Sequence, residues 1–310
     1  MAPTCFEEST VKSIVLSCIA ICLLASPVAQ AKLQVLTCEP EWAALTRELA
    51  GDSADIVSAT TAFQDPHHIQ ARPSLLAHAR RADLMVCTGA ELEIGWLPLL
   101  QRQAGNGRIQ AGQPGYFDAS AQVPLLERPT RLDRAQGDIH AAGNPHVQLD
   151  PRRIATIANA LAARLAQIDP ANASRYAARN ADFQTRWQAA IARWQTQGAR
   201  LKGVPVVVHH SSFSYLADWL GLVVVGDLEP KPGVEPSAAH LAELLKSLKV
   251  HPAKMILHTA YQSAQPSEWL SKKAGIPAVE LPFTVGGAPG TDDLFGLFDV
   301  TLTRLLGAAP

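Results

Sequence analysis

The chain has 310 residues, of which 47% are hydrophobic, 18% charged and 6% aromatic. Its 27 Lys and Arg nearly balance its 28 Asp and Glu, so we expect no basic face for nucleic acid. The 20 Gly and 22 Pro are scattered through an apolar sequence, which excludes a collagen-like or disordered chain and leaves a globular protein long enough for two domains.

Residues 1–31 have the composition of a secretory signal peptide. Lys12 precedes an apolar stretch of about 13 residues, and Ala29-Gln30-Ala31 supplies an A-x-A cleavage site. A membrane anchor would need about 20 apolar residues, and Pro27 ends the run before that length. We therefore expect cleavage after Ala31 and a periplasmic location.

The first lobe, residues 32–168, alternates short apolar runs with helical patterns. Asp150 and Pro151 are typical of a helix N-cap and first turn, and residues 105–143 are rich in Gly, Pro and charge, which indicates loop and short strands. This alternation predicts a parallel sheet with helices on both faces. The predicted strands are 33–37, 55–58 and 84–87, and the predicted helices are 42–49, 75–81, 91–103 and 150–167.

Residues 169–201 form an unusually long helical pattern. Tyr176, Phe183, Trp187 and Trp194 make an apolar stripe at helical spacing. At 1.5 Å per residue, about 28 helical residues span roughly 42 Å, which is longer than one small domain needs. We therefore expect a bridging helix between two lobes.

The second lobe, residues 202–310, restarts the alternation. The chain is thus predicted to be an α/β protein with two Rossmann-like lobes, each with a parallel sheet, joined by one long bridging helix. The predicted strands are 204–208, 223–226, 254–257 and 279–282, and the predicted helices are 213–220, 237–248, 267–274 and 292–306.

Two of the five cysteines, Cys38 and Cys87, lie beyond the predicted signal peptide, and both end predicted strands. If those strands are neighbours, the two thiols come within bridging distance, and a disulfide persists in an exported protein. Two reduced, buried cysteines are an equally acceptable reading of the same pattern.

Histidines occur at three places where a loop meets a predicted element. They lie in Asp65-Pro66-His67-His68, in Gly143-Asn144-Pro145-His146, and as His209-His210 after the strand at 204–208. Ligands of open α/β sheets bind outside the carboxyl ends of the strands, and imidazole is the commonest protein ligand for zinc and similar metals. The placement indicates a metal site, although a single loop histidine is usually only solvated.

Three segments together resemble the cluster A-I substrate-binding proteins of zinc and manganese ABC importers (solute-binding protein family 9). The family patterns are D-P-H-x-x-x-x-x-P, D-P-H-x-W-x-D-P and H-x-A-F-x-Y. The matching segments are Asp65-Pro66-His67 with Pro73, Asn144-Pro145-His146 with Leu149-Asp150-Pro151, and the stretch 210–215.

The resemblance extends over essentially the whole chain after residue 31, and the long bridging helix is also a feature of that family. It implies that His67, His146 and His210 bind Zn(II) between the lobes and that the protein delivers the ion to an ABC membrane permease. His68 and His209 are then neighbours of the ligands, directed to the opposite pleat or to solvent. We expect a monomer.

Three departures from the family pattern concern the completeness of the site. The segment that resembles F-T-D-S-L reads Phe283-Thr284-Val285-Gly286-Gly287, so the expected aspartate is missing. The long His-rich loop before the second motif is reduced to the remnant 138–140, and Gln148 replaces a tryptophan. A water could supply the fourth ligand, and the candidate side chains are Glu229, Asp292, Asp293 and His140.

Three nitrogen ligands without a certain carboxylate favour Zn(II) over Mn(II). A receptor for Mn(II) or for another transition metal, such as copper or nickel, remains the alternative within the same family. A zinc hydrolase could also use three histidines and a water, but the chain has no H-E-x-x-H or G-x-S-x-G motif. A receptor for another small ligand, with incidental histidines, is the third alternative. We expect a binding protein and not an enzyme.

Overall fold

The computed structural model of the chain describes residues 1, 31–130, 137 and 140–309. Residues 2–30 of the predicted signal peptide and residues 138–139 of the predicted loop remnant lie outside the described residues. Within the described part, no helix has the length and apolar character needed to cross a membrane. One compact unit begins at Leu33 and contains both lobes.

The first lobe is built on a four-stranded parallel sheet with the strand order β2-β1-β3-β4. Its fourth strand lies in the segment predicted as loop and short strands. The strands are β1 Leu33–Thr37, β2 Ala54–Ser58, β3 Leu84–Cys87 and β4 Tyr116–Asp118. The helices of this lobe are α2 Pro40–Ala50, α3 Pro73–Arg81, α4 Leu97–Ala104 and α5 Pro151–Ile168.

The second lobe repeats the arrangement, with a parallel sheet in the equivalent order β6-β5-β7-β8. Its strands are β5 Pro205–Val208, β6 Val223–Asp227, β7 Met255–Thr259 and β8 Ala278–Leu281. Its helices are α7 Ser214–Leu220, α8 Ala238–Ser247, α9 Gln265–Ala274 and α10 Leu294–Ala308. The predicted fold class, two parallel α/β lobes, is confirmed.

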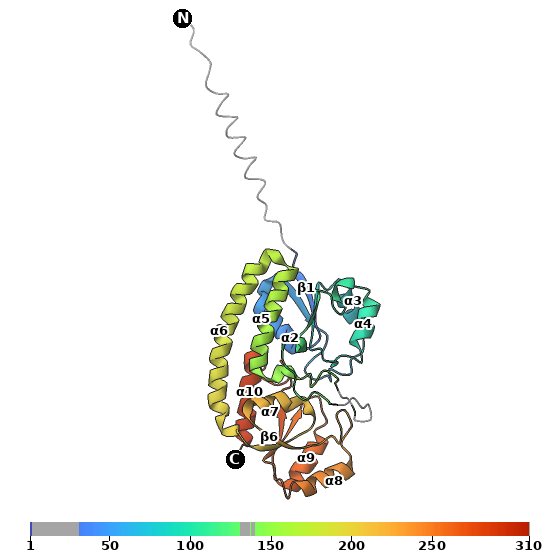
Figure 1. Cartoon of the computed structure of the whole chain (residues 1–310), viewed down its shortest axis with the longest axis vertical. Helices are drawn as coiled ribbons and strands as arrows, with labels where there is room; N and C mark the ends of the chain where they lie inside the picture. The colour runs from blue at the N-terminus through green and yellow to red at the C-terminus, as the bar shows by residue number, and fades with distance from the viewer. Residues whose placement is uncertain (2–30, 131–136, 138–139, 310) are drawn as a thin grey trace. The chain divides into compact units, whose positions relative to one another are not determined.

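The long helix α6, Ala173–Gly198, is flanked by single 3-10 turns at Pro170–Asn172 and Ala199–Leu201 and runs beside both lobes (Figure 1). Its aromatic stripe is buried. The Trp187 indole donates to the Pro151 carbonyl of α5 at 2.8 Å, and the Trp194 indole donates to Asp299 of α10 at 2.6 Å. The stripe is therefore packing that joins the lobes, as the sequence indicates.

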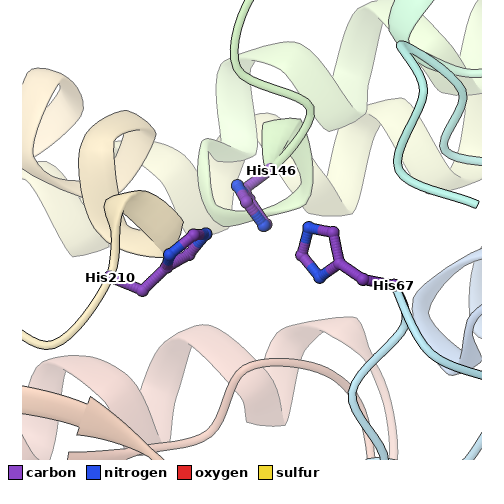
Figure 2. Close-up of side chains that lie close together, drawn as sticks. All are labelled: His67, His146 and His210. Atoms are coloured by element: carbon purple, nitrogen blue, oxygen red, sulfur yellow. The ribbon is translucent and has the colours of Figure 1, made fainter. Parts of the chain in front are cut away.

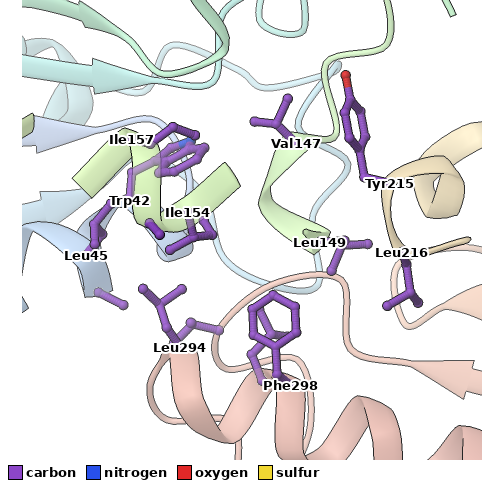
Figure 3. Packing of buried hydrophobic residues seen from close by; sticks show 14 of the residues in the cluster. Trp42, Leu45, Val147, Leu149, Ile154, Ile157, Tyr215, Leu216, Leu294 and Phe298 are labelled. Atoms are coloured by element: carbon purple, nitrogen blue, oxygen red, sulfur yellow. The ribbon is translucent and has the colours of Figure 1, made fainter. Parts of the chain in front are cut away.

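One hydrophobic core passes through both lobes. Trp42 of α2 and Phe298 of α10 belong to the same buried cluster as the α6 stripe, and Figure 3 shows Trp42, Tyr215 and Phe298 around a common interior. Burial of apolar surface is the main favourable term in folding, so this shared cluster stabilises the two lobes together, beside a smaller buried cluster that belongs to each lobe alone.

Arginines at intervals of seven residues add polar contacts along α6. Arg179 and Arg186 bond to Glu48 of α2, through its carbonyl and its carboxylate respectively. Arg193 and Arg200 bond to the Asp299 carboxylate and the Leu306 carbonyl of α10. Seven residues are close to two helical turns, so these side chains share one side of the helix and tie it to each lobe in turn.

The helix predicted at 91–103 begins only at Leu97, so that prediction was wrong at its start. Ala90 and Glu91 have φ values of 48° and 68°, in the left-handed region, and Pro98 stands in the first helical turn, where proline is favoured. Gly105 ends the helix with φ 64°, as predicted. The irregular turn directs the Glu93 side chain into the interior, where it is 2% exposed.

Cys38 and Cys87 form a disulfide, with their Cα atoms 4.7 Å apart. The pairing follows from the sheet, because β1 and β3 are adjacent and Thr37 is in register with Val86. Of the two alternatives that the sequence left open, the structure therefore contains the bridge.

Candidate metal centre

His67, His146 and His210 converge on one point between the lobes (Figure 2). His67 lies in the loop between β2 and α3, His146 precedes the 3-10 turn Val147–Leu149, and His210 follows β5. One ring nitrogen from each lies within 4.8 Å of the others. Side chains from three separated segments and from both lobes thus meet at a single centre.

Each of the three rings is held by an oxygen on its outer nitrogen, Nδ1. A carboxylate or amide oxygen only accepts, so Nδ1 carries the proton and Nε2 keeps its lone pair. Outer partners of this kind orient histidine ligands at metal sites. The partners are Asp65 Oδ1 for His67 at 2.7 Å, Asn144 Oδ1 for His146 at 2.8 Å and Glu229 Oε2 for His210 at 2.7 Å.

Two of these partners act through a short local motif, Asp/Asn-Pro-His. The Asp65 oxygen also accepts from the main-chain N–H of His67 at 3.0 Å, and the Asn144 oxygen accepts from that of His146 at 2.9 Å. Asp and Asn commonly make such bonds two residues ahead. In both motifs, the residue two positions before the histidine therefore fixes the orientation of its ring.

The orientation of the Asn144 amide follows from its other bonds. Its Nδ2 group donates to the Ser211 carbonyl and to Glu127, each at 2.8 Å, so Oδ1 must face His146. Tyr215 adds a further link, because its hydroxyl donates to the Asn144 carbonyl at 2.6 Å and accepts from the Leu126 N–H at 3.0 Å. Residues from both lobes thus support the position of His146.

The inner nitrogens, Nε2, are buried and could each donate a lone pair to a cation. In the described part of the chain, Nε2 of His67, His146 and His210 has no hydrogen-bond partner. Burial, followed by the nearby His210 and His67, lowers the pKa of His146 well below its ordinary value. A neutral imidazole with a free lone pair is the form that binds metal, and a cation would satisfy three otherwise orphaned polar atoms.

Two negative charges lie just outside the ring of histidines. Burial alone would raise the pKa of Asp65, but its hydrogen bonds to the side chain and main chain of His67 outweigh burial and lower it. Glu229 contacts the outer nitrogen of His210 and also accepts from the Gly233 N–H at 2.8 Å. With three neutral imidazoles, these two carboxylates balance the charge of a divalent ion.

The candidates for a fourth ligand lie in different places. The His140 ring centroid is 5.5 Å from that of His67 and 6.4 Å from that of His146, so this loop residue borders the centre. Glu229 is already bonded to the outer nitrogen of His210. Asp292 is exposed, and Asp293 caps α10 through the Gly296 N–H at 2.7 Å.

At this centre, the described His, Cys, Asp and Glu side chains whose ligand atoms all lie within 4.8 Å of one another are the three histidines alone. Val285, where the family pattern has aspartate, is buried and apolar. Gln148, the other departure, is also buried. None of these positions supplies a carboxylate to the inner side of the rings.

A cavity of about 200 Å³ opens from the centre and receives residues of both lobes. Its described lining is mainly polar and includes four histidines, and Tyr261 is the one Phe, Tyr or Trp residue among them. His68 and His209 also line it, and burial lowers the pKa of His209 to about 4. The volume and polarity suit a partly hydrated ion better than an apolar organic molecule.

The orienting residues were not part of the sequence-based prediction, except for Glu229, which was considered as a direct ligand. A signal for two of them is present, because Asp65 and Asn144 stand two residues before the histidines they hold. Glu229 stands 19 residues after His210, at the end of a neighbouring strand, so only strand adjacency places it there.

Comparison with known proteins is consistent with this geometry. A family model described as zinc-uptake complex component A, periplasmic (ZnuA), matches residues 35–308. The high-affinity zinc uptake system protein ZnuA of Bacillus subtilis (strain 168) is 25% identical over 249 residues, which cover 79% of this chain and 76% of that protein. The zinc-binding lipoprotein AdcA of Streptococcus pneumoniae serotype 4 is 26% identical over 252 residues, or 80% of this chain. The chain spans about half the length, 49%, of AdcA.

Solved structures share the fold. A crystal structure of ZnuA has a TM-score of 0.74 at 22% identity, covering 90% of this chain and all of that one. A Mn-bound periplasmic metal binding protein from Candidatus Liberibacter asiaticus gives 0.73 at 17% identity, with 90% and 100% coverage. The Ni²⁺ complex of FpvC from P. aeruginosa gives 0.72 at 22%, with 90% and 97% coverage. Since these neighbours hold different metals, the fold alone does not determine which metal is bound.

Proposed function

Because the chain belongs to the ZnuA family of periplasmic zinc-uptake components, we propose that it captures one Zn²⁺ ion between its lobes through His67, His146 and His210. Members of this family are solute-binding proteins of metal uptake and not enzymes. The observation that carries the proposal is the convergence of three buried, unpartnered Nε2 atoms whose rings are each held through Nδ1.

Zinc is favoured over manganese by the chemistry of the donors. Three imidazole nitrogens form the inner set, whereas Asp65 and Glu229 support the rings from outside. Manganese prefers oxygen ligands, and zinc accepts nitrogen in a tetrahedral set. The fourth position is assigned to His140 or to a water, because the His140 ring lies beside that of His67.

The partner and location follow from the family and remain part of the proposal. A cleavable signal at residues 1–31 would export the chain as a monomeric receptor, which would pass its ion to an ABC permease. A hydrolase is disfavoured, because the two carboxylates nearest the rings, Asp65 and Glu229, are occupied in holding Nδ1 and are not directed at the inner face as a general base.

The test is metal analysis and competitive zinc titration of the purified protein with single alanine variants at the three histidines. We expect one tight Zn²⁺ per chain, and each variant should lose more affinity than the roughly 10–100-fold typical of an outer partner. Glu229→Gln should fall within that smaller range. His251→Ala is the matched control, because His251 is exposed. Absence of stoichiometric zinc, or unchanged binding in a variant that carries all three alanine substitutions, would refute the proposal.

A further inference from the structure

A second group of metal-type donors lies in the first lobe, outside the three-histidine centre. It consists of Cys38, Cys87, Glu39 and Glu93, which we call the thiol–carboxylate cluster. Cys38 directly follows β1 and Cys87 ends the adjacent strand β3, and a carboxylate oxygen of Glu93 lies within 4.8 Å of both sulfurs. All four residues are at most 2% exposed.

The two carboxyl groups of the cluster are held by the same short stretch of backbone. The Thr88 N–H donates to Glu93 Oε1 at 2.7 Å and to Glu39 Oε2 at 3.3 Å, and the Gly89 N–H donates to Glu93 Oε2 at 3.1 Å. The Thr88 hydroxyl adds a bond to Glu39 Oε2 at 3.0 Å. Both carboxyls are therefore fixed by the backbone that follows Cys87, and Glu93 is the one that lies beside both sulfurs.

The cluster lacks a positive charge. Among the described residues, no Lys or Arg forms an ion pair with Glu39 or Glu93, and the second oxygen of Glu39, Oε1, is buried without a hydrogen-bond partner. Buried carboxyls are expected to be paired or to coordinate a metal. Glu93 is satisfied by its backbone donors and Glu39 shares a hydrogen bond with it, but the disulfide, which is neutral and apolar, offers no partner to Glu39 Oε1.

Reduction changes what the sulfurs can do. A cysteine thiolate is a zinc ligand at about 2.3 Å, and carboxylate oxygens bind at about 2.0–2.2 Å. In a tetrahedral site two such sulfurs lie roughly 3.8 Å apart, a separation that side-chain rotation from neighbouring strand ends can reach. Two thiolates and two carboxylates would then complete a four-coordinate set.

We propose that the Cys38–Cys87 disulfide masks a second, redox-controlled site for a thiophilic divalent cation such as Zn²⁺ or Cd²⁺. A dithiol reductant transfers two electrons and two protons to the bridge and is itself oxidised to a disulfide. The metal then displaces the two thiol protons and binds the sulfurs of Cys38 and Cys87 and the carboxylate of Glu93. Glu39, which shares the Thr88 N–H with Glu93, would turn toward the sulfurs to supply the fourth oxygen.

The site is tested with Cd²⁺ in a His67→Ala/His146→Ala/His210→Ala background, so that the result does not depend on the proposed zinc function. The protein is titrated under anaerobic conditions before and after reduction with a non-chelating phosphine. The readout is the ultraviolet charge-transfer band of a cadmium–thiolate bond, with circular dichroism recorded in parallel.

We expect no thiolate band in the oxidised protein and one Cd²⁺ per chain in the reduced protein. Cys38→Ser/Cys87→Ser should abolish the band, and Glu93→Gln, which keeps a carbonyl acceptor for Thr88, should weaken binding at least tenfold. If reduction loosens the lobe, stoichiometric Cd²⁺ should restore its dichroism. A reduced protein that neither binds nor recovers, or a Glu93→Gln variant that binds equally well, would overturn the proposal.

Discussion

Glu41 in the first turn of α2 is a buried carboxyl that reaches from one lobe to the other. It accepts a hydrogen bond from the Thr284 hydroxyl in the segment after β8, and it is 1% exposed. Burial raises its pKa from 4.5 to about 7, although the bond from Thr284 acts in the opposite direction. The perturbation that tests this environment is Glu41→Gln, which keeps the size and a polar acceptor but cannot ionise.

The sign of the effect follows from proton linkage. The folded protein binds this proton more tightly than the unfolded chain, so the free energy of unfolding decreases as pH rises from about 4.5 to about 7. At 1.36 kcal/mol per pKa unit, the loss approaches about 3 kcal/mol above pH 7. The Gln variant should not lose this contribution. Its free energy of unfolding, relative to that of the wild type, should therefore be higher at pH 8 than at pH 4.

The assay is urea unfolding of the metal-free protein at several pH values. Metal is removed because zinc bound by histidines would add stability with the opposite dependence on pH. Since one core runs through both lobes, a cooperative transition is expected. Glu243→Gln is the control, because that carboxylate is exposed and pairs only at the surface with Lys246. Parallel stability profiles of the wild type and Glu41→Gln would refute the assigned pKa.

Three further predictions concern the centre and the core. Asn144→Ala should weaken zinc binding roughly 10–100-fold in competition titrations, because His146 loses the oxygen that orients it. Asn144→Asp keeps that oxygen but replaces the donor to Glu127 and to the Ser211 carbonyl with a second oxygen, so it should weaken binding as well. Zinc affinity should fall as pH decreases, because protons compete with the metal for the imidazole nitrogens, and a flat titration series would contradict this. Trp187→Ala should lower the free energy of unfolding by about 3–5 kcal/mol in denaturant titrations while leaving the zinc stoichiometry at one.

Much of the architecture was predictable from local sequence. Apolar runs of four or five residues gave strands in the predicted places, and the Asp150-Pro151 pair marked a helix start that the structure confirms, with Asp150 accepting from the Arg152 N–H. The wrong start at 91–103 arose because residues 91–96 have helical composition, whereas Ala90 and Glu91 adopt left-handed backbone angles. Propensity is a weak prior where tertiary contacts oppose it.

How much of the candidate site could be predicted from the sequence differs from one residue to the next. The Asp-Pro-His and Asn-Pro-His motifs carry both the histidine and the group that holds it, so His67 and His146 could be identified from a few residues. Their role as ligands remains the prediction that the zinc titration tests. Glu229 was identified only as a possible ligand, and its contact with the outer nitrogen of His210 depends on β6 lying beside β5.

By itself, the sequence determined the two alternating α/β halves, the long helix with its aromatic stripe and the three histidine segments, because periodicity, proline and Asx chemistry act over a few residues. Only the tertiary structure decided which ring nitrogens face the centre, that Cys38 and Cys87 are bridged, and that Glu41 and Glu93 are buried. Those properties depend on which strands and lobes meet. Burial and charge pairing are set by neighbours distant in the chain, and local sequence patterns do not encode them.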